Sequence, residues 1–224
     1  MTRNRLALTL AIALSACAAP AFAQQDIDKI NGGITAEAGQ SYGDLETVNG
    51  GIDLESGAKV EDISTVNGGI EGGNDIQADS IEAVNGGVRL GERVQVGNIE
   101  TVNGGIFLDR GSRVARNIEN VNGGIGIVGT VVGGDISTVS GDITVGADAH
   151  VKGGLRVEKP DNHGFSINWG KQRPPRIVIG PNAVVDGPLV FERDVTLYVH
   201  TSARIGRVSG ATAKPYSTAT PPEE

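Results

Sequence analysis

The stretch "TVNGGI" stands at Thr47–Ile52, again at Thr65–Ile70 and again at Thr101–Ile106. Close variants stand at Ala83–Val88 ("AVNGGV") and Asn120–Ile125 ("NVNGGI"). The asparagine of this motif recurs with spacings of 18, 18, 18, 18 and 19 residues, at Asn31, Asn49, Asn67, Asn85, Asn103 and Asn122. Ser140 continues the series 18 residues later, so residues 31–157 make seven successive units of one repeat. A fixed short period of this kind predicts a solenoid.

Apolar residues recur at fixed positions within each unit. With the asparagine as position 1, they stand at positions 4, 6, 10, 12, 15 and 18, as in Ile52, Leu54, Val60, Ile63 and Val66. A spacing of two is that of a strand, and Gly, Asp, Ser or Asn fill the gaps between the apolar pairs. Three short strands per unit predict one coil of a parallel β-helix, stacked on the next coil at about 4.8 Å. We expect all six apolar positions, including position 18, to face the core.

The Asn-Gly-Gly corner recurs because every coil must turn at the same place. We expect its glycines to supply positive φ angles without strain. The asparagines stack in such a coil, and we expect their amides to form a hydrogen-bonded ladder along the axis. The alternative is that asparagine is used only because it favours turns.

An 18-residue period also fits three hexapeptides, which is the pattern of a left-handed β-helix. Leu54, Val60 and Val66 are six residues apart and agree with it. The apolar residue at position 15 does not, because hexapeptide coils place a polar turn there. Parallel crossovers are right-handed by strong default. The predicted fold is therefore an all-β, single-stranded parallel β-helix of three-sided coils, with a right-handed turn.

The repeat is interrupted after Val157 and resumes further on. Residues 158–176 form an insertion with three prolines and the only tryptophan of the chain. Residues 177–208 return to apolar alternation and predict terminal coils, so the β-helix domain spans 24–208. The Pro-, Ser- and Thr-rich residues 209–224 are predicted to be a disordered tail.

The insertion holds the most specific local cluster of the sequence, Phe165 and Trp169 beside Lys171 and Arg173. Aromatic rings next to cations predict a ligand-binding loop that stacks on a sugar or docks an acidic partner. The alternative is that Trp169 packs against the side of the solenoid as a lid.

The N-terminal segment 1–23 predicts export. Arg3 and Arg5 precede the apolar run Leu6–Ala16, and "CAAPAFA" follows at Cys17–Ala23. This is the layout of a signal peptide cleaved after Ala23. The run "LSAC" also matches a bacterial lipobox, in which case Cys17 becomes the lipidated first residue. The expected location is periplasmic or secreted, or alternatively the outer membrane as a lipoprotein.

Composition and charge narrow the function further. The 224 residues include 34 Gly and only 4% aromatic residues. Loss of Arg3 and Arg5 lowers the basic count from 19 to 17 against 27 acids, a net charge of −10. Such a field disfavours nucleic acid and anionic lipid as partners. We therefore expect no nucleic acid, and membrane attachment only through lipidation at Cys17.

Catalytic candidates are sparse. The three histidines, His150, His163 and His200, stand at different phases of the repeat, without a nucleophile or metal-ligand spacing beside them. We expect no catalytic residues, no cofactor and no metal site, and hence no enzyme. A further hypothesis is a hexapeptide acyltransferase with His150 or His200 as base. The export signal argues against this hypothesis, because the acyl donor of such enzymes is cytosolic.

The 18-residue Val/Ile/Gly coils resemble those of bactofilins, which are polymer-forming bacterial proteins built on a short right-handed β-helix. They also resemble adhesin-type β-helical proteins of bacterial envelopes, in which "TVNGxI" rungs recur. The resemblance covers most of the chain after residue 23 and implies a structural role, but the export signal departs from typical bactofilins, which are cytoplasmic. The expected function is an exported structural or adhesive envelope protein. Its expected partners are further copies, by end-to-end assembly, or an envelope polysaccharide or protein. The alternative is a polysaccharide-binding or polysaccharide-degrading β-helix.

Overall fold

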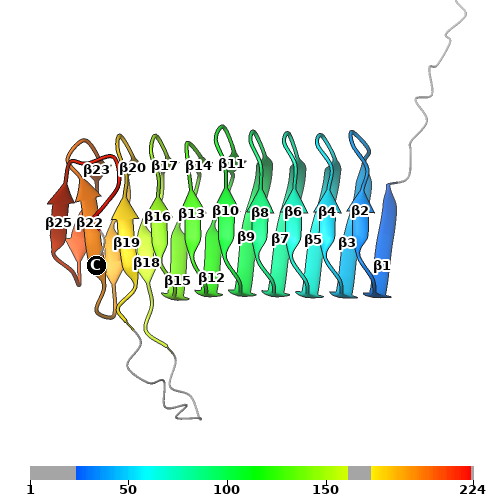
Figure 1. Cartoon of the computed structure of the whole chain (residues 1–224), viewed down its shortest axis with the longest axis horizontal. Coiled ribbons are helices and arrows are strands. Elements are labelled where there is room, and N and C mark those ends of the chain that lie inside the picture. Colours follow the sequence, from blue (N-terminus) through cyan, green and yellow to red (C-terminus); the bar gives the residue numbers. More distant parts are fainter. Residues whose placement is uncertain (1–23, 161–172, 223–224) are drawn as a thin grey trace, which may run out of the picture.

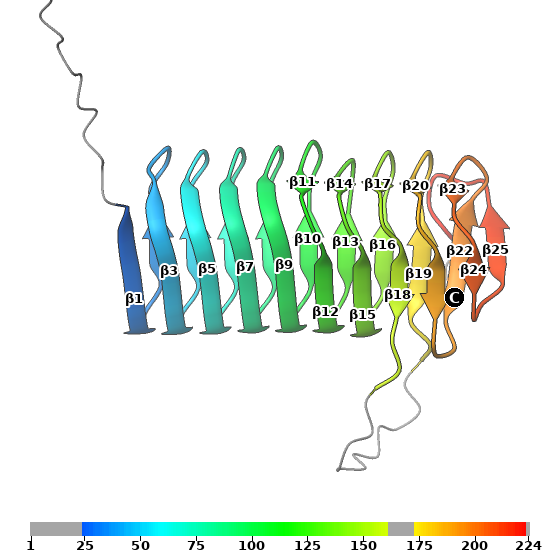
Figure 2. The same ribbon diagram turned by 180° about the vertical axis from the view of Figure 1, so that it is seen from behind.

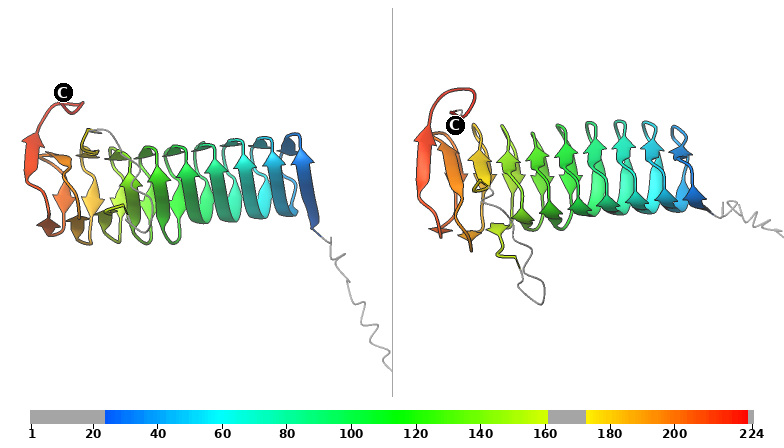
Figure 3. Two further views of the ribbon diagram at one scale, coloured as in Figure 1. Left: turned by 90° about the horizontal axis from the view of Figure 1, so that it is seen from below. Right: turned by 60° about the horizontal axis from the view of Figure 1, so that its bottom comes forward.

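The computed structural model describes residues 24–160 and 173–222, which form strands and turns with no helix among them. The strands make two parallel sheets, of 15 and 10 strands. The coils lie side by side in sequence order, from β1 (Gln25–Asn31) at one end of a rod to β25 (Ala213–Tyr216) at the other (Figure 1). Two further views show the same uninterrupted stack (Figure 3). The predicted parallel β-helix is confirmed.

The 10-stranded sheet takes one short strand from every coil. Its strands are β2 (Ile34–Ala36), β4 (Ile52–Leu54), β6 (Ile70–Gly72), β8 (Val88–Leu90), β10 (Ile106–Leu108), β13 (Ile125–Ile127), β16 (Ile143–Val145), β19 (Arg176–Ile179), β22 (Thr196–His200) and β25. Ten rungs at about 4.8 Å per step make a rod of about 43 Å.

The 15-stranded sheet holds the other two sides of each coil. Its strands are β1, β3 (Tyr42–Asn49), β5 (Lys59–Asn67), β7 (Gln77–Asn85), β9 (Gln95–Asn103), β11 (Arg113–Val114), β12 (Ile118–Asn122), β14 (Val131–Val132), β15 (Ile136–Ser140), β17 (His150–Val151), β18 (Leu155–Val157), β20 (Val184–Val185), β21 (Leu189–Phe191), β23 (Arg204–Ile205) and β24 (Val208–Ser209). In the early coils two sides merge into one long strand, and β3, β5, β7 and β9 lie side by side in Figure 2. From β9 onward the sides separate, because β9 pairs with both β11 and β12.

The core is a set of ladders of equal positions. The register pairs Ile52 with Ile70 and Leu45 with Ile63, so that side chains of one position stack from coil to coil. Positions 4, 6, 10, 12 and 15 are buried as predicted, with Ile70 and Ile63 almost fully enclosed. Each such aliphatic side chain contributes about 1.5–3 kcal/mol of hydrophobic stabilisation.

The prediction for position 18 is wrong. Val48, Val66, Val84, Val102 and Val121 lie on the outer surface, and Thr65 at position 17 is buried instead; only in the last unit is the predicted Val157 buried. The strand continues its alternation from Ile63 to the corner, so positions 15 and 17 both face inward. The buried hydroxyl is satisfied, because Thr65 Oγ1 donates to the carbonyl of Gly50 over 3.1 Å. The alternation of the strand therefore turns the valine outward, also in the coil where Ala83 stands at position 17.

The asparagine ladder is confirmed. The amide Nδ2 of each asparagine donates to Oδ1 of the asparagine one coil earlier, over 3.0–3.2 Å. The ladder runs through Asn31, Asn49, Asn67, Asn85, Asn103 and Asn122. Five hydrogen bonds between asparagine side chains thus join six successive coils along one edge of the rod.

The first corner glycine has the predicted positive φ at Gly32 (107°) and at Gly123 (142°), and close contact between coils is a second reason for it. A Cβ at Gly68 would stand 1.9 Å from the carbonyl oxygen of Gly50 in the preceding coil, and one at Gly86 would stand 1.7 Å from that of Gly68. The glycine is required because neighbouring coils approach too closely for a side chain. Positive φ also occurs at the next turn, where Gly57 has φ 78° and Arg93 has φ 58°.

The predicted disordered tail of residues 209–224 contains a strand. β25 pairs with β22, and the side chain of Tyr216 is buried against the last coils. The Tyr216 hydroxyl donates to the carbonyl of Ile179 over 3.2 Å, and Arg176 Nη2 donates to the carbonyl of Pro222 over 2.8 Å. The composition indicated disorder, but the open edge of the last coil supplies pairing that no isolated tail has. Burial raises the pKa of Tyr216, and Arg176 partly opposes this.

Candidate binding surfaces

Most of the predicted loop cluster lies outside the described residues. This holds for Phe165, Trp169 and Lys171, and for Cys17 in the N-terminal segment. Arg173 is described, and it forms an ion pair with Asp142: Nη2 lies 2.6 Å from Oδ2 and Nη1 lies 3.2 Å from Oδ1. The backbone N–H of Arg176 donates to the same carboxylate over 2.8 Å. Asp142 therefore anchors the chain where it returns to the solenoid, and Arg173 serves that contact.

The described histidines lie apart from one another. His150 Nε2 lies 2.7 Å from Oδ2 of Asp186, and both side chains are about half exposed. His200 Nδ1 lies 2.8 Å from the hydroxyl of Ser202. Within residues 24–160 and 173–222, no three His, Cys, Asp or Glu side chains are grouped so that they could hold a metal ion.

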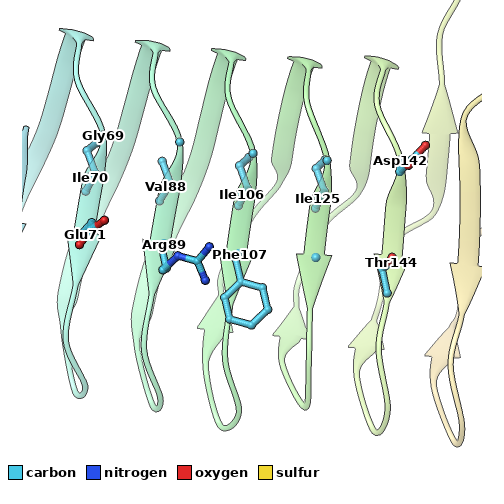
Figure 4. Close-up of a pocket in the computed structure, with 14 residues that line it drawn as sticks. Gly69, Ile70, Glu71, Val88, Arg89, Ile106, Phe107, Ile125, Asp142 and Thr144 are labelled. Carbon is cyan, nitrogen blue, oxygen red and sulfur yellow. The ribbon is translucent and has the colours of Figure 1, made fainter. Parts of the chain in front are cut away.

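A groove runs along the outer face of the 10-stranded sheet (Figure 4). We call it the corner groove. Its volume is about 540 Å³, and it is lined by Gly69, Ile70, Glu71, Gly87, Val88, Arg89, Gly105, Ile106, Phe107, Gly124, Ile125, Gly126, Asp142 and Thr144. The middle residue of each three-residue strand points outward because its neighbours face the core. The register therefore sets Glu71, Arg89, Phe107 and Gly126 in one row.

The row combines an aromatic ring with charged groups. The guanidinium carbon of Arg89 lies 5.4 Å from the centroid of the Phe107 ring, a cation–π contact. Gly126 has no side chain, and a Cβ there would lie 3.4 Å from Phe107. The missing side chain leaves open space beside the ring. The corner groove thus offers an apolar ring, a guanidinium, and the carboxylate of Glu71 along one shallow trough, as ligand sites often do.

A second surface lies on the 15-stranded sheet. Val48, Val66, Val84, Val102 and Val121 are each between 39 and 41% exposed, and Ile30 is 73% exposed. The register places Thr47 beside Thr65 and Asn49 beside Asn67, so the valines between them are also neighbours. These six residues, which we call the valine row, form one apolar stripe across six coils. Contiguous apolar surface of this kind marks an interaction site.

An acidic row runs parallel to the valine row, two positions earlier in each strand. The register pairs its residues from coil to coil as Glu46, Ser64, Glu82, Glu100, Glu119, Ser137 and Arg156. Between the two rows lies a channel of about 260 Å³, with Val84, Val102 and Val121 on one side and Glu82, Glu100 and Glu119 on the other. The surface is therefore a ridge, a channel and a line of carboxylates.

No family model matches the chain, and neither a curated protein nor a solved structure is detectably similar to it. The resemblance to bactofilins and adhesin-type proteins therefore rests on the coil pattern alone. No helix in the described part of the chain is long and apolar enough to cross a membrane.

Sequence reasoning missed both surfaces. The signal for the corner groove was Phe107 at position 5, where other units have Asp53, Glu71 or Arg89. The signal for the valine row was the constancy of valine at position 18, which was assigned to the core. An invariant apolar residue next to a threonine with a hydrogen-bonding partner inside is equally compatible with a surface row.

Proposed function

We propose that the chain is an exported, non-enzymatic structural or adhesive β-helix of the bacterial cell envelope. It acts through the long faces of its rod, by binding an envelope partner or by self-assembly. The observation that carries this proposal is the valine row, because six exposed aliphatic side chains in one line are unfavourable in water unless something covers them. The basic and apolar layout of residues 1–23 supports export.

The two ends of the rod differ in what they offer for assembly. At the last rung, β25 carries Pro215, which has no N–H to donate to a further strand. At the first rung, β1 pairs only with β3 among the described residues. An edge strand of this kind is a template for pairing with another chain. End-to-end assembly would therefore use the β1 end.

Cell fractionation tests the proposal. The tagged chain is expressed in a Gram-negative bacterium, and the cytosol, periplasm, membranes and cell surface are assayed separately. We expect the chain outside the cytosol, and we expect Val66→Thr with Val84→Thr and Val102→Thr to release it from envelope material. The matched control is Thr35→Ala, which is exposed on the other sheet outside the corner groove and should change nothing. A cytosolic chain, or equal retention of the row variant, would reject the proposal.

The same experiment separates the two export routes. Conversion of Cys17→Ser moves the chain from the membrane to the soluble periplasmic fraction if the lipobox is used. It leaves the distribution unchanged if cleavage follows Ala23.

A second candidate function, polysaccharide binding, is favoured by the corner groove. The Phe107 ring can stack on a sugar ring beside the space left by Gly126, and Arg89 and Glu71 can bond its hydroxyls. Calorimetric titration with soluble cell-wall polysaccharides measures this. We expect Phe107→Ala to abolish binding, and Thr35→Ala on the same sheet to retain it. Binding that survives loss of the ring would exclude the corner groove.

A further inference from the structure

The valine row has a period that selects its partner. Its side chains repeat at about 4.8 Å, the distance between strands. An α-helix lying along the row advances about 5.4 Å per turn and drifts out of step by about 3 Å over five rungs. An extended strand along the row presents one side chain to it every 6.6 Å or so. Another β-helix of the same period meets every rung at once.

The adjacent charge excludes one further occupant. The acidic row, with Glu46, Glu82, Glu100 and Glu119, lies beside the valines along the same face. Amphipathic surfaces that bind membranes carry Lys and Arg beside their apolar side, because cellular lipid surfaces are anionic. The valine row therefore suits a protein surface rather than a lipid surface.

We propose that the valine row is the interface by which two copies of this chain pair side by side, with their rods parallel and the valines of each copy in the channel of the other. The inference rests on the proposed function and deepens it by naming the partner and its orientation. It concerns the sides of the rod, and is independent of assembly at the β1 end.

The orientation follows from the order of the rows. Across the face, the acidic row comes first, the valine row second and the asparagine ladder third. In the parallel pair, a two-fold axis runs along the rods, and the facing partner presents its three rows in the reverse order. Each valine row can therefore enter the channel of the other copy. Each acidic row then lies near the partner's asparagine ladder. The amide nitrogens of Asn85 and Asn103 each carry two N–H groups, and the ladder engages one of them, so the carboxylates meet donors.

The antiparallel arrangement is unfavourable for both packing and charge. Its two-fold axis runs across the rods, and the facing partner then presents the three rows in the same order. The valine row therefore meets the partner's valine row, and Glu100 meets the partner's acidic row. Like charges in direct opposition are repulsive, and ridges on ridges leave the channel empty. The row order therefore distinguishes the two dimers.

The interface is small. Six rungs by five residues of strand give about 450 Å² per copy, against about 800 Å² in a stable complex. The pair is thus weak and depends on concentration. Salt should strengthen it, because the chain is acidic and screening reduces repulsion between copies.

Cysteine trapping tests the pairing and its orientation. The full chain with Cys17→Ser provides a background without thiols. Val48→Cys and Val121→Cys are introduced singly, near the two ends of the valine row, and one carries a tag that changes its size. Each is oxidised alone and in an equal mixture, because a disulfide needs Cα atoms within about 7 Å. The matched control is Thr144→Cys, which is exposed on the other sheet.

The expected result is a Val48→Cys dimer and a Val121→Cys dimer, with no mixed dimer and at least about tenfold more product than the Thr144→Cys control. Mixed dimers in place of like dimers would overturn the parallel orientation. Yields equal to the control would overturn the pairing. Sedimentation of the chain with Val66→Thr, Val84→Thr and Val102→Thr should show at least about tenfold weaker association.

The two proposals fail separately. If the chain is exported and bound to the envelope but forms no row-specific disulfides, the pairing is rejected and the envelope role stands. If the chain stays in the cytosol but forms row-specific disulfides, the envelope role is rejected and the pairing stands.

Discussion

The first glycine of the corner sets the distance between coils, and Gly68→Ala should show it most clearly. A Cβ on Gly68 would stand 1.9 Å from the carbonyl oxygen of Gly50, whereas ordinary contact begins near 3.4 Å. The two coils must therefore separate locally by about 1.5 Å, nearly a third of the spacing between rungs. Both atoms belong to the backbone, so no side-chain rotation relieves the contact.

Such a shift disrupts hydrogen bonds between neighbouring coils. The N–H of Gly50 donates to the carbonyl of Asn67 over 3.0 Å, and the N–H of Ile52 donates to Gly69 over 2.9 Å. Asn67 also donates to Asn49 in the amide ladder over 3.0 Å. Loss of two such bonds costs about 1 kcal/mol each, and overpacking adds about 1–3 kcal/mol. The expected loss of stability is about 3–5 kcal/mol, or roughly 6–20 °C in Tm for a chain of this length.

Two other glycines provide matched controls. A Cβ on Gly69, the second corner residue, would lie 3.4 Å from the carbonyl oxygen of Gly87, so Gly69→Ala should cost less than about 1 kcal/mol. A Cβ on Gly57 would make only ordinary contacts, at 3.6 Å from Gly39, but Gly57 has φ 78°, so Gly57→Ala should cost about 1 kcal/mol through backbone strain. The three substitutions thus separate close approach from turn conformation.

The assay is thermal and urea unfolding followed by far-ultraviolet circular dichroism. A solenoid is stabilised by contacts between neighbouring coils, so a defect in the middle of the stack weakens both halves. The expected order of melting temperatures is wild type, Gly69→Ala, Gly57→Ala and then Gly68→Ala well below the rest. If Gly68→Ala melted within a few degrees of Gly69→Ala, the close approach of coils would not explain the glycine.

Three further predictions follow from the same coils. Ile70→Asp should cost several kcal/mol because it buries an unpaired carboxylate, whereas Val66→Asp on the outer surface should shift urea unfolding by less than about 1 kcal/mol. Asn120→Thr should stabilise the chain by about 1 kcal/mol in the same assay, because the buried Oδ1 of Asn120 has no partner among the described residues. The hydrogen bond from Arg93 lowers the pKa of Asp75 below its ordinary 3.8. The contribution of the Arg93–Asp75 ion pair to stability is therefore present above pH 3.8 and is lost as the pH falls through the lowered pKa of Asp75 in the folded state. Melting of Asp75→Asn and wild type should converge at that end of a pH series and differ slightly at pH 7. A constant difference would contradict the ion pair.

Much of the candidate interface was visible in the sequence without being recognised as a surface. The 18-residue period identifies the valines of the row, but the sequence pattern predicts them to face the core. The corner groove depends on the outward direction of Phe107 and on the absence of a side chain at Gly126, which only the register brings together. The loop cluster around Trp169 was the most specific sequence feature, and its one described member, Arg173, holds the returning chain to Asp142.

The sequence by itself determined the coil. An 18-residue period with apolar residues such as Ile52 and Ile63 at constant positions admits only stacked short strands, because only equal positions in register bury every rung alike. The tertiary structure alone decided which of Thr65 and Val66 faces the core. Hydrophobicity favours the valine, but the strand keeps its alternation and the corner carbonyl of Gly50 accepts the threonine hydroxyl. That carbonyl belongs to a different coil, and a local pattern cannot supply a partner 15 residues away.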